Sequence, residues 1–122
     1  MSEIRNALIE DTMLGVQDHG ITTFFLYVDY GDGSHQGYGG YGLDEYSQKD
    51  KKRHGHAYGM EAIIRVLETV GVSKWEDLKG KYIRVRGGGL MSDKIEAIGH
   101  ITKDRWLDLK ELASVYQSKE IV

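Results

Sequence analysis

The chain has 122 residues, of which 40% are hydrophobic, and it carries a net charge of -3. This length fits one domain with one core, and the near-neutral charge excludes a dominant DNA- or RNA-binding role, which usually shows as a large basic excess. The absence of cysteine excludes disulfides, thiolate metal ligands and a thiol nucleophile, and it favours an intracellular protein. We expect a single domain, residues 1–122, without a signal peptide or a membrane-spanning stretch.

The first thirty residues predict two strands. Residues 4–16 alternate loosely between apolar and polar types, which indicates a strand. The apolar residues expected on one side of it are Ile4, Leu8, Leu14 and Val16. After a turn at 17–20, residues 21–30 are rich in β-branched and aromatic types and predict the strongest strand of the chain. Both faces of this strand are largely apolar, so it is expected to be central or to be covered by a second subunit.

A glycine-rich stretch, residues 31–42, precedes a polar segment, 44–56, which is expected to be an exposed loop. The glycines between 37 and 42 have a spacing close to the dinucleotide-binding fingerprint, but no apolar helix follows them, which excludes a Rossmann site. Two interpretations remain. The glycines form a strand edge or turn, which is the stronger interpretation, or Gly39 and Gly40 form a close-packed wall in which Tyr38 and Tyr41 stack on a base.

The second half of the chain predicts two main helices, one short helix and a hairpin. A helix over 57–70 is expected to bury one face and to end at Gly71, and a pair of charges four residues apart is expected to bridge on its other face. The residues of the expected buried face are Met60, Ile63, Ile64 and Leu67. Ser73 and Glu76 form a capping-box pattern that predicts a short helix closed by Gly80.

Residues 81–86 and 94–102 predict two strands, joined through 87–93 into an antiparallel hairpin. Asp108 and Glu111 then indicate the start of the final helix, whose apolar residues repeat through Tyr116. Strands that come in hairpin pairs, with helices kept separate, predict an α+β fold with an antiparallel sheet, two main helices and one short helix.

One predicted strand carries the residues best suited to a ligand. Alternation places Tyr82, Arg84 and Arg86 on the same face. An aromatic ring can stack on a base, and guanidinium groups can bind phosphate oxygens in a bidentate way. The alternative is an exposed sheet face whose arginines pair with acids of the neighbouring strand, such as Glu96. The adjacent triple glycine, 87–89, favours the binding interpretation because bare backbone amides can hold anions.

Other candidate groups are weaker. Arg105 and Trp106 are further candidate ligand-binding residues, with Arg105 as an additional cation for a phosphate, although the first expectation for Trp106 is that it anchors the last helix in the core. His54 and His56 could both hold a metal, but no third ligand with recognisable spacing accompanies them. The chain also lacks a nucleophile motif. We therefore predict a binding protein rather than an enzyme, with no catalytic residues, metal site or cofactor.

Seven segments form a familiar pattern: IEDTMLG at 9–15, DHGI at 18–21, GYGGY at 37–41, AYGME at 57–61, LETVGV at 67–72, WEDLKGKY at 75–82 and IGHI at 98–101. This pattern resembles small phage proteins of the Thoeris anti-defence type, over most of the chain from about 5 to 106. The resemblance implies a phage-encoded sponge in the host bacterial cytoplasm. It would sequester cyclic ADP-ribose isomers made by bacterial TIR-domain immune enzymes, without cleaving them, and so block that immunity.

The resemblance also implies partners and site residues. Family members form homo-oligomers, dimers and in some cases hexamers, with ligands where subunits meet, and some hold cyclic oligonucleotides in separate pockets. The family's stacking role falls on Tyr82, and its anion contacts fall on Arg84, Arg86 and Arg105. The polar contact of the loop falls near Ser92 or Asp93, although the triple glycine and Asp93 depart from the family's pattern.

Two other functions stay open from the sequence. One is a small nucleotide-hydrolysing enzyme that uses Asp18, His19 or His100. The other is a phage factor that binds a host protein through the apolar second face of residues 21–30.

Overall fold

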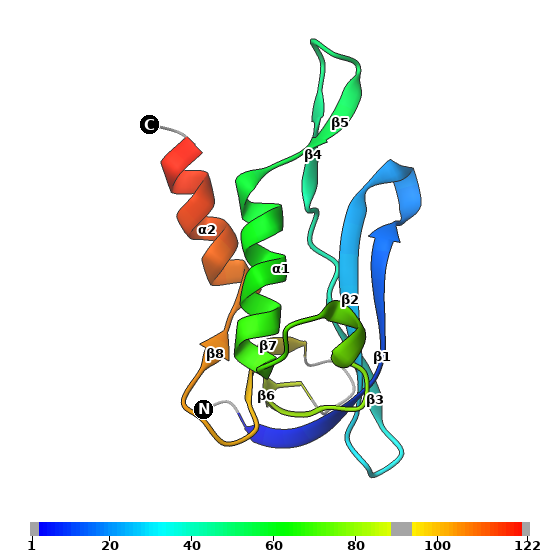
Figure 1. Ribbon diagram of the computed structural model, residues 1–122, viewed down its shortest axis with the longest axis vertical. Helices are drawn as coiled ribbons and strands as arrows, with labels where there is room; N and C mark the ends of the chain where they lie inside the picture. The colour runs from blue at the N-terminus through cyan, green and yellow to red at the C-terminus, as the bar shows by residue number, and fades with distance from the viewer. Residues whose placement is uncertain (1–2, 89–93, 121–122) are drawn as a thin grey trace.

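The strands form a six-stranded antiparallel sheet in the order β3-β2-β1-β6-β7-β8, with a separate two-stranded sheet β4-β5, as the ribbon in Figure 1 shows. This computed structural model describes residues 3–88 and 94–120. The strands of the large sheet are β1 (Ile4–Val16), β2 (Thr22–Asp29), β3 (His35–Gly39), β6 (Tyr82–Gly87), β7 (Ile95–His100) and β8 (Trp106–Leu107). The other elements are β4 (Asp44–Ser47), β5 (Lys52–Gly55), α1 (Ala57–Val70), α2 (Leu109–Glu120) and the short 3₁₀ helices η1 (Asp18–Gly20) and η2 (Trp75–Asp77).

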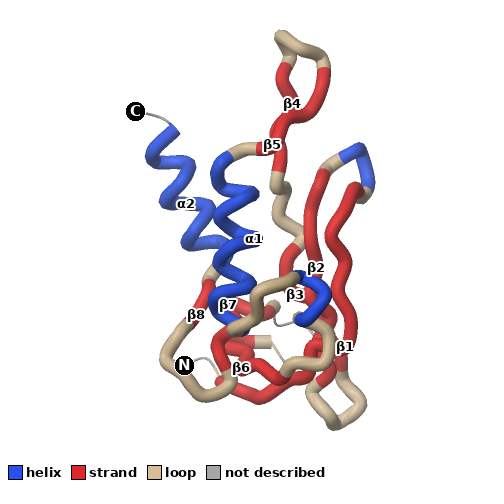
Figure 2. Tube along the Cα trace, viewed as in Figure 1, coloured by secondary structure: helices blue, strands red, loops and turns tan. Residues whose placement is uncertain are grey.

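The predicted α+β class is confirmed: both main helices lie on one side of the large sheet (Figure 2). The hairpin predicted from the strands around 81–86 and 94–102 is also present, as the antiparallel pair β6 and β7. Within the described residues, every helix is too short or too polar to cross a membrane.

A bulge in β1 decides which side of that strand is buried. Residues 4–8 of β1 pair with β6 and residues 8–16 pair with β2, and the register shifts between Ile9 and Asp11. An extra residue inverts the alternation of side chains beyond it. The expectation that four apolar residues share one side is therefore wrong. Ile4 and Leu8 lie on the outer face, opposite Arg86 and Tyr82, whereas Leu14 and Val16 lie on the inner face beyond the end of the core.

Strand β2 lies inside the sheet, as expected, with a neighbour on each side. Phe24, Leu26 and Val28 are fully buried on its inner face. On its outer face, Phe25 and Tyr27 stack with ring centroids 5.7 Å apart. This outer face remains partly exposed because both main helices cover the opposite side.

The polar segment expected to be a loop is a hairpin. Residues 44–47 and 52–55 form β4 and β5, which pair in register and project away from the large sheet. Arg53 Nη2 lies 2.9 Å from Asp44 Oδ1, at the base of the hairpin. The sequence indicated a loop because alternation in these strands is between polar residues and gives no apolar signal.

Helix α1 has its predicted bounds, but only half of its expected face is buried, since Ile63 and Leu67 pack against the core and the other two residues do not. His56 caps its start by accepting from the Gly59 amide, and Gly71 ends it with a φ of 91°. The expected bridge between Glu61 and Arg65 is present at 2.7 Å. The buried residues are Tyr58, Gly59, Ala62, Val66, Thr69 and Val70.

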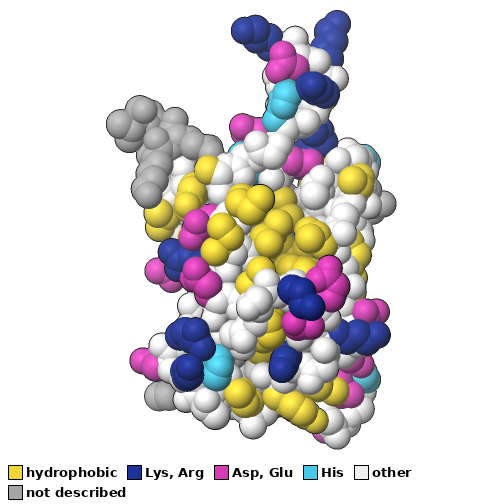
Figure 3. Space-filling view, in the orientation of Figure 1, with side chains coloured by type: hydrophobic (Ala, Val, Ile, Leu, Met, Phe, Trp, Pro, Cys, Tyr) yellow, Lys and Arg dark blue, Asp and Glu magenta, His cyan; other side chains and the backbone are white. Residues whose placement is uncertain are grey.

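Met60 and Ile64, which were expected inside, are 62% and 40% exposed. Hydrophobic side chains gather on the surface in the middle of Figure 3, in the region where α1 lies in Figure 1. The reason lies in the small residues of the true buried face. A Cβ at Gly59 would lie 2.2 Å from the Leu43 carbonyl oxygen, so the helix approaches the chain too closely for any larger residue there. The buried face is therefore centred on Ala62 and Val66, and the larger side chains of Met60 and Ile64 lie outside it.

The capping box expected at Ser73 is not formed as predicted. The segment is the 3₁₀ helix η2, with Lys74 at the N-cap position and no side-chain capping bond. The other predicted cap is confirmed, since Asp108 Oδ1 accepts from the Glu111 amide at 3.0 Å at the start of α2.

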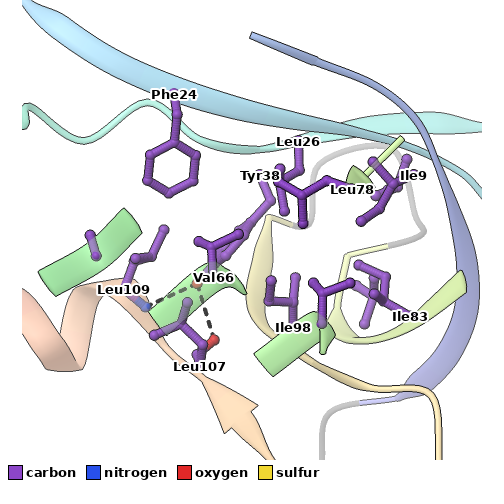
Figure 4. Close-up of a cluster of buried hydrophobic side chains, with 14 of the residues drawn as sticks. Ile9, Phe24, Leu26, Tyr38, Val66, Leu78, Ile83, Ile98, Leu107 and Leu109 are labelled. Carbon is purple, nitrogen blue, oxygen red and sulfur yellow. Dashed lines mark hydrogen bonds between the residues drawn. The ribbon is translucent and has the colours of Figure 1, made fainter. Parts of the chain in front are cut away.

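One hydrophobic core joins the inner face of the sheet to the two main helices (Figure 4). Its fully buried side chains include Ile9, Phe24, Leu26, Val66, Leu78, Ile83, Ile98 and Leu109. Residues from both halves of the chain meet in it, as expected for one domain.

Candidate functional site

The outer face of β6 carries the three residues that alternation placed there. Ile83 and Val85 are fully buried, while Tyr82, Arg84 and Arg86 point to the opposite side. Tyr82 is 60% exposed, so its ring is accessible for stacking. The predicted common face is therefore confirmed by the geometry of the strand.

Trp106 joins this face through the register of the sheet. Arg84 pairs with Gly99 of β7, and Gly99 pairs with Trp106 of β8, so these residues form one row across three strands. The Arg84 guanidinium carbon lies 4.8 Å from the centre of the indole, and that of Arg86 lies 5.6 Å away. Both distances are within the range of cation–π attraction.

Gly99 explains why the indole is on the sheet surface. A Cβ at this position would lie 2.7 Å from Trp106 Cε3, so the ring rests against bare backbone. The expectation that Trp106 anchors the last helix in the core is wrong. Its ring packs on the surface of the sheet, against the backbone of Gly99.

The two arginines already have partners within the chain. Arg84 donates from Nε to the His100 carbonyl and from Nη2 to the Lys103 carbonyl, both at 2.7 Å. Arg84 therefore holds the turn between β7 and β8 in place. The bonds to two carbonyls leave its positive charge uncompensated, which is the property needed near a phosphate.

Arg86 differs, because it faces two carboxylates. Its Nε lies 3.6 Å from Glu96 Oε2 and its Nη2 lies 3.8 Å from Asp108 Oδ2. Pairing with an acid of the neighbouring strand was the alternative interpretation for this face, and for Arg86 it is confirmed. These separations exceed hydrogen-bond length. A ligand anion would therefore compete with the two carboxylates for the positive charge of Arg86, but it would not have to break a hydrogen bond to either of them.

Positive groups gather around His100. Burial is the first cause of a lowered pKa for this imidazole, followed by the charges of Arg105, Lys103 and Arg84. Its Nδ1 accepts from the backbone amides of Thr102 at 3.1 Å and Lys103 at 3.0 Å. An imidazole that accepts at Nδ1 is not protonated there, so both observations favour the neutral ring.

An open pocket of about 610 Å³ lies beside this cluster. Its lining residues are Asn6, Val70, Gly71, Gly80, Lys81, Tyr82, His100 and Ile101. Lys81 and Tyr82 therefore line the same pocket as His100. We define the β6 site as this pocket and the adjoining residues Arg84, Lys103, Arg105 and Trp106.

Four predicted residues of the glycine-rich segment lie elsewhere. Tyr38 is buried in the core, where its hydroxyl accepts from the Leu109 amide at 2.9 Å and donates to the Leu107 carbonyl (Figure 4). Burial also raises the pKa of this phenol. Its ring is thus unavailable for stacking on a ligand, contrary to the functional interpretation.

Gly39 and Gly40 have structural roles. Both have positive φ, and a Cβ at Gly39 would lie 2.3 Å from the Phe24 carbonyl oxygen. The strand-edge interpretation is the one confirmed here. Tyr41 is partly exposed but lines a different pocket, near α2. Ser92 and Asp93 lie outside the described residues.

The histidines that were candidates for metal binding or acid–base chemistry lie apart from one another. His54 Nε2 lies 2.9 Å from Asp50, and His56 caps α1, so these two residues have separate roles. The turn η1, with His19, joins β1 and β2 at the end of their hairpin that lies away from β7 (Figure 1), whereas His100 is the last residue of β7.

Glu10, Asp29 and His35 form a cluster that no sequence motif indicated, and their donor atoms lie within 4.8 Å of one another. Three adjacent strands supply them, and the bulge places Glu10 beside His35. Predicting this cluster would have required locating the bulge in β1, which the alternation of residue types does not reveal.

Comparison with models of known protein families and with characterised protein sequences finds no match. The family resemblance is thus supported only by the segments that suggested it.

Proposed function

We propose that this protein binds a cyclic ADP-ribose isomer, or a related cyclic oligonucleotide, at the β6 site and sequesters it without cleaving it. In this proposal it is a phage anti-defence protein that acts in the host bacterial cytoplasm and blocks TIR-based immunity. The observation that supports it is the common face of Tyr82, Arg84 and Trp106, with Lys103 and Arg105 nearby. Such a face can bind a base by stacking and a diphosphate by charge.

The arrangement suits binding more than hydrolysis. Hydrolysis needs a group placed to activate water, usually an imidazole or carboxylate with a suitable partner. In the described part of the β6 site the imidazole is His100, whose Nδ1 is occupied by two backbone amides and whose surroundings are cationic. Sequestration requires affinity alone.

We further propose that the protein acts as a homo-oligomer, as the resemblance implies. The stacked pair Phe25 and Tyr27 gives the outer face of β2 an apolar, partly exposed surface. A second copy that covers this surface would add the burial that a chain of this size otherwise lacks.

Isothermal titration against a panel of cyclic ADP-ribose isomers and cyclic oligonucleotides tests the binding. Arg105 and Lys103 are exposed. Replacing either by alanine should weaken the binding of a phosphorylated ligand by about 1–3 kcal/mol, as expected for the loss of a charged hydrogen bond. Lys49→Ala, in the hairpin remote from the site, is the matched control and should bind normally. Equal affinity of all three variants would refute the assignment of the site.

Mass spectrometry of the released ligand separates binding from hydrolysis. After incubation and heat denaturation of the protein, the ligand should be recovered intact and in stoichiometric amount. Accumulation of a cleaved product, lost in His100→Ala, would instead support the nucleotide-hydrolysing enzyme.

A further inference from the structure

A second pocket, of about 270 Å³, lies between the start of α1, the helix α2 and the segment that leads into β4. Its lining residues are Tyr41, Gly42, Glu45, His56, Tyr58, Ala113 and Tyr116. It shares no lining residue with the β6 site, and the two pockets lie at opposite ends of α1, one beside Tyr58 and the other beside Val70. A ligand bound here would thus leave the β6 site open.

Aromatic rings form most of the wall. The ring centroids of Tyr58 and Tyr116 are 6.2 Å apart at 61°, and those of His56 and Tyr58 are 5.6 Å apart at 57°. Tyr41 adds a third phenol close enough to Tyr58 to help raise its pKa, behind burial as the main cause. Because the rings meet at steep angles, they form a corner that a compact group can fill.

The charge of the lining is negative. Among the described residues that line the pocket, Glu45 supplies a carboxylate and none is a lysine or arginine. His56 accepts from the Gly59 amide through Nδ1, which requires the unprotonated nitrogen. The nearby Arg53 is neutralised by Asp44, 2.9 Å away. A phosphate would meet repulsion here, in contrast to the β6 site.

Aromatic faces carry negative potential, and a corner of such faces beside a carboxylate attracts a cation. A quaternary ammonium fits best, because its methyl groups contact the rings and it has no N–H groups that would need acceptors. We propose that this pocket is a binding site for a small organic cation of the quaternary ammonium class. It is independent of the proposed nucleotide binding.

The test compares choline with 3,3-dimethyl-1-butanol, which has the same shape without the charge. Nuclear magnetic resonance titration of the full chain should show saturable choline binding, with shifts at Tyr41, Tyr58 and Tyr116. The neutral molecule should bind about tenfold more weakly, as expected when a partly desolvated cation–π contact is lost. Equal binding of the two molecules, or no saturable binding of choline, would overturn the proposal.

Two variants localise the site. Tyr41→Leu removes a partly exposed ring, and Glu45→Gln removes the carboxylate charge. Each substitution should weaken the binding of choline several-fold. Tyr46→Leu is the matched control, since Tyr46 is 53% exposed on β4 but lines neither pocket. Unchanged spectra away from the pocket show that the variants fold.

If Tyr41→Leu and Tyr46→Leu bind choline equally, the pocket is not the site. A cyclic nucleotide that competes with choline would likewise contradict a separate cation site. Loss of nucleotide binding in β6-site variants that keep choline binding separates the two proposals.

Discussion

At the scale of single residues, glycines decide where the aromatic side chains lie. Gly99 lets the Trp106 indole rest on the sheet, and there the ring meets both arginines of β6. The sequence showed the arginines and the tryptophan but not their proximity, because proximity follows from the pairing of three strands. Alternation within β6 could be predicted locally; the row across β7 and β8 could not.

Gly99→Ala tests this packing. The added methyl group would collide with the indole, and the displacement should lower the free energy of unfolding by about 1–3 kcal/mol, as for other overpacked sites. Chemical denaturation followed by tryptophan fluorescence measures both the loss and the changed surroundings of Trp106. Gly55→Ala is the control, because a Cβ there has nothing within 4 Å. Equal stability of both variants would mean that the indole does not need the bare backbone.

The pKa values of two histidines should be shifted in opposite directions. The pKa of His100 is lowered, first by burial and then by its cationic neighbours, whereas the hydrogen bond that the His35 ring donates to the Glu10 carboxylate raises the pKa of His35. Nuclear magnetic resonance titration should place His100 below and His35 above the usual value near 6.5. A His100 pKa above that of His35 would contradict the geometry of both.

The signs of the linked stability changes also differ. A lowered folded-state pKa means that the unfolded chain binds the proton more readily, so the contribution of His100 is complete above the unfolded pKa and declines as the pH falls below it. For His35 the contribution is complete below the unfolded pKa and is lost as the pH rises through the higher folded value. Denaturation of His100→Ala and His35→Ala across pH 5 to 8, about the range in which histidine titrates, checks the two signs.

At the scale of elements, the sequence predicted where most elements lie better than which face each one buries. The bounds of α1 follow from local signals, and Gly71 ends the helix as expected. Its buried face depends on how closely Gly59 approaches Leu43, which is a tertiary contact. In β1 the bulge at Glu10 changed the face in the same way, and nothing in the alternation located it.

Substitutions in α1 distinguish the two faces. Ala62 is fully buried, so Ala62→Leu should cost about 1–3 kcal/mol of stability through overpacking. Met60 is 62% exposed, and Met60→Gln should stay within about 0.5 kcal/mol of the parent chain, as surface changes usually do. Urea denaturation measures both. The reverse order of effects would restore the face that periodicity predicted.

At the scale of the whole molecule, the sheet has one covered side and one open side. The helices cover the inner face, so Tyr82 and Arg84 of the β6 site and the outer face of β2 lie on the side that a second copy can reach. Length and composition predicted one domain, but they carry no information on what covers its second face.

The stacked pair on β2 makes the proposed assembly testable. Phe25 and Tyr27 are partly exposed, and a lysine in place of Tyr27 would put a charge into any apolar interface formed there. Sedimentation velocity should show an oligomer for the parent chain and a smaller species for Tyr27→Lys. Because the side chain points away from the core, the variant should retain its fold, which circular dichroism checks. Tyr46→Lys, on the projecting hairpin, is the control and should leave the mass unchanged. If Tyr27→Lys keeps the parent mass, the interface lies on another surface; if it also loses nucleotide binding, the assembly contributes to the β6 site.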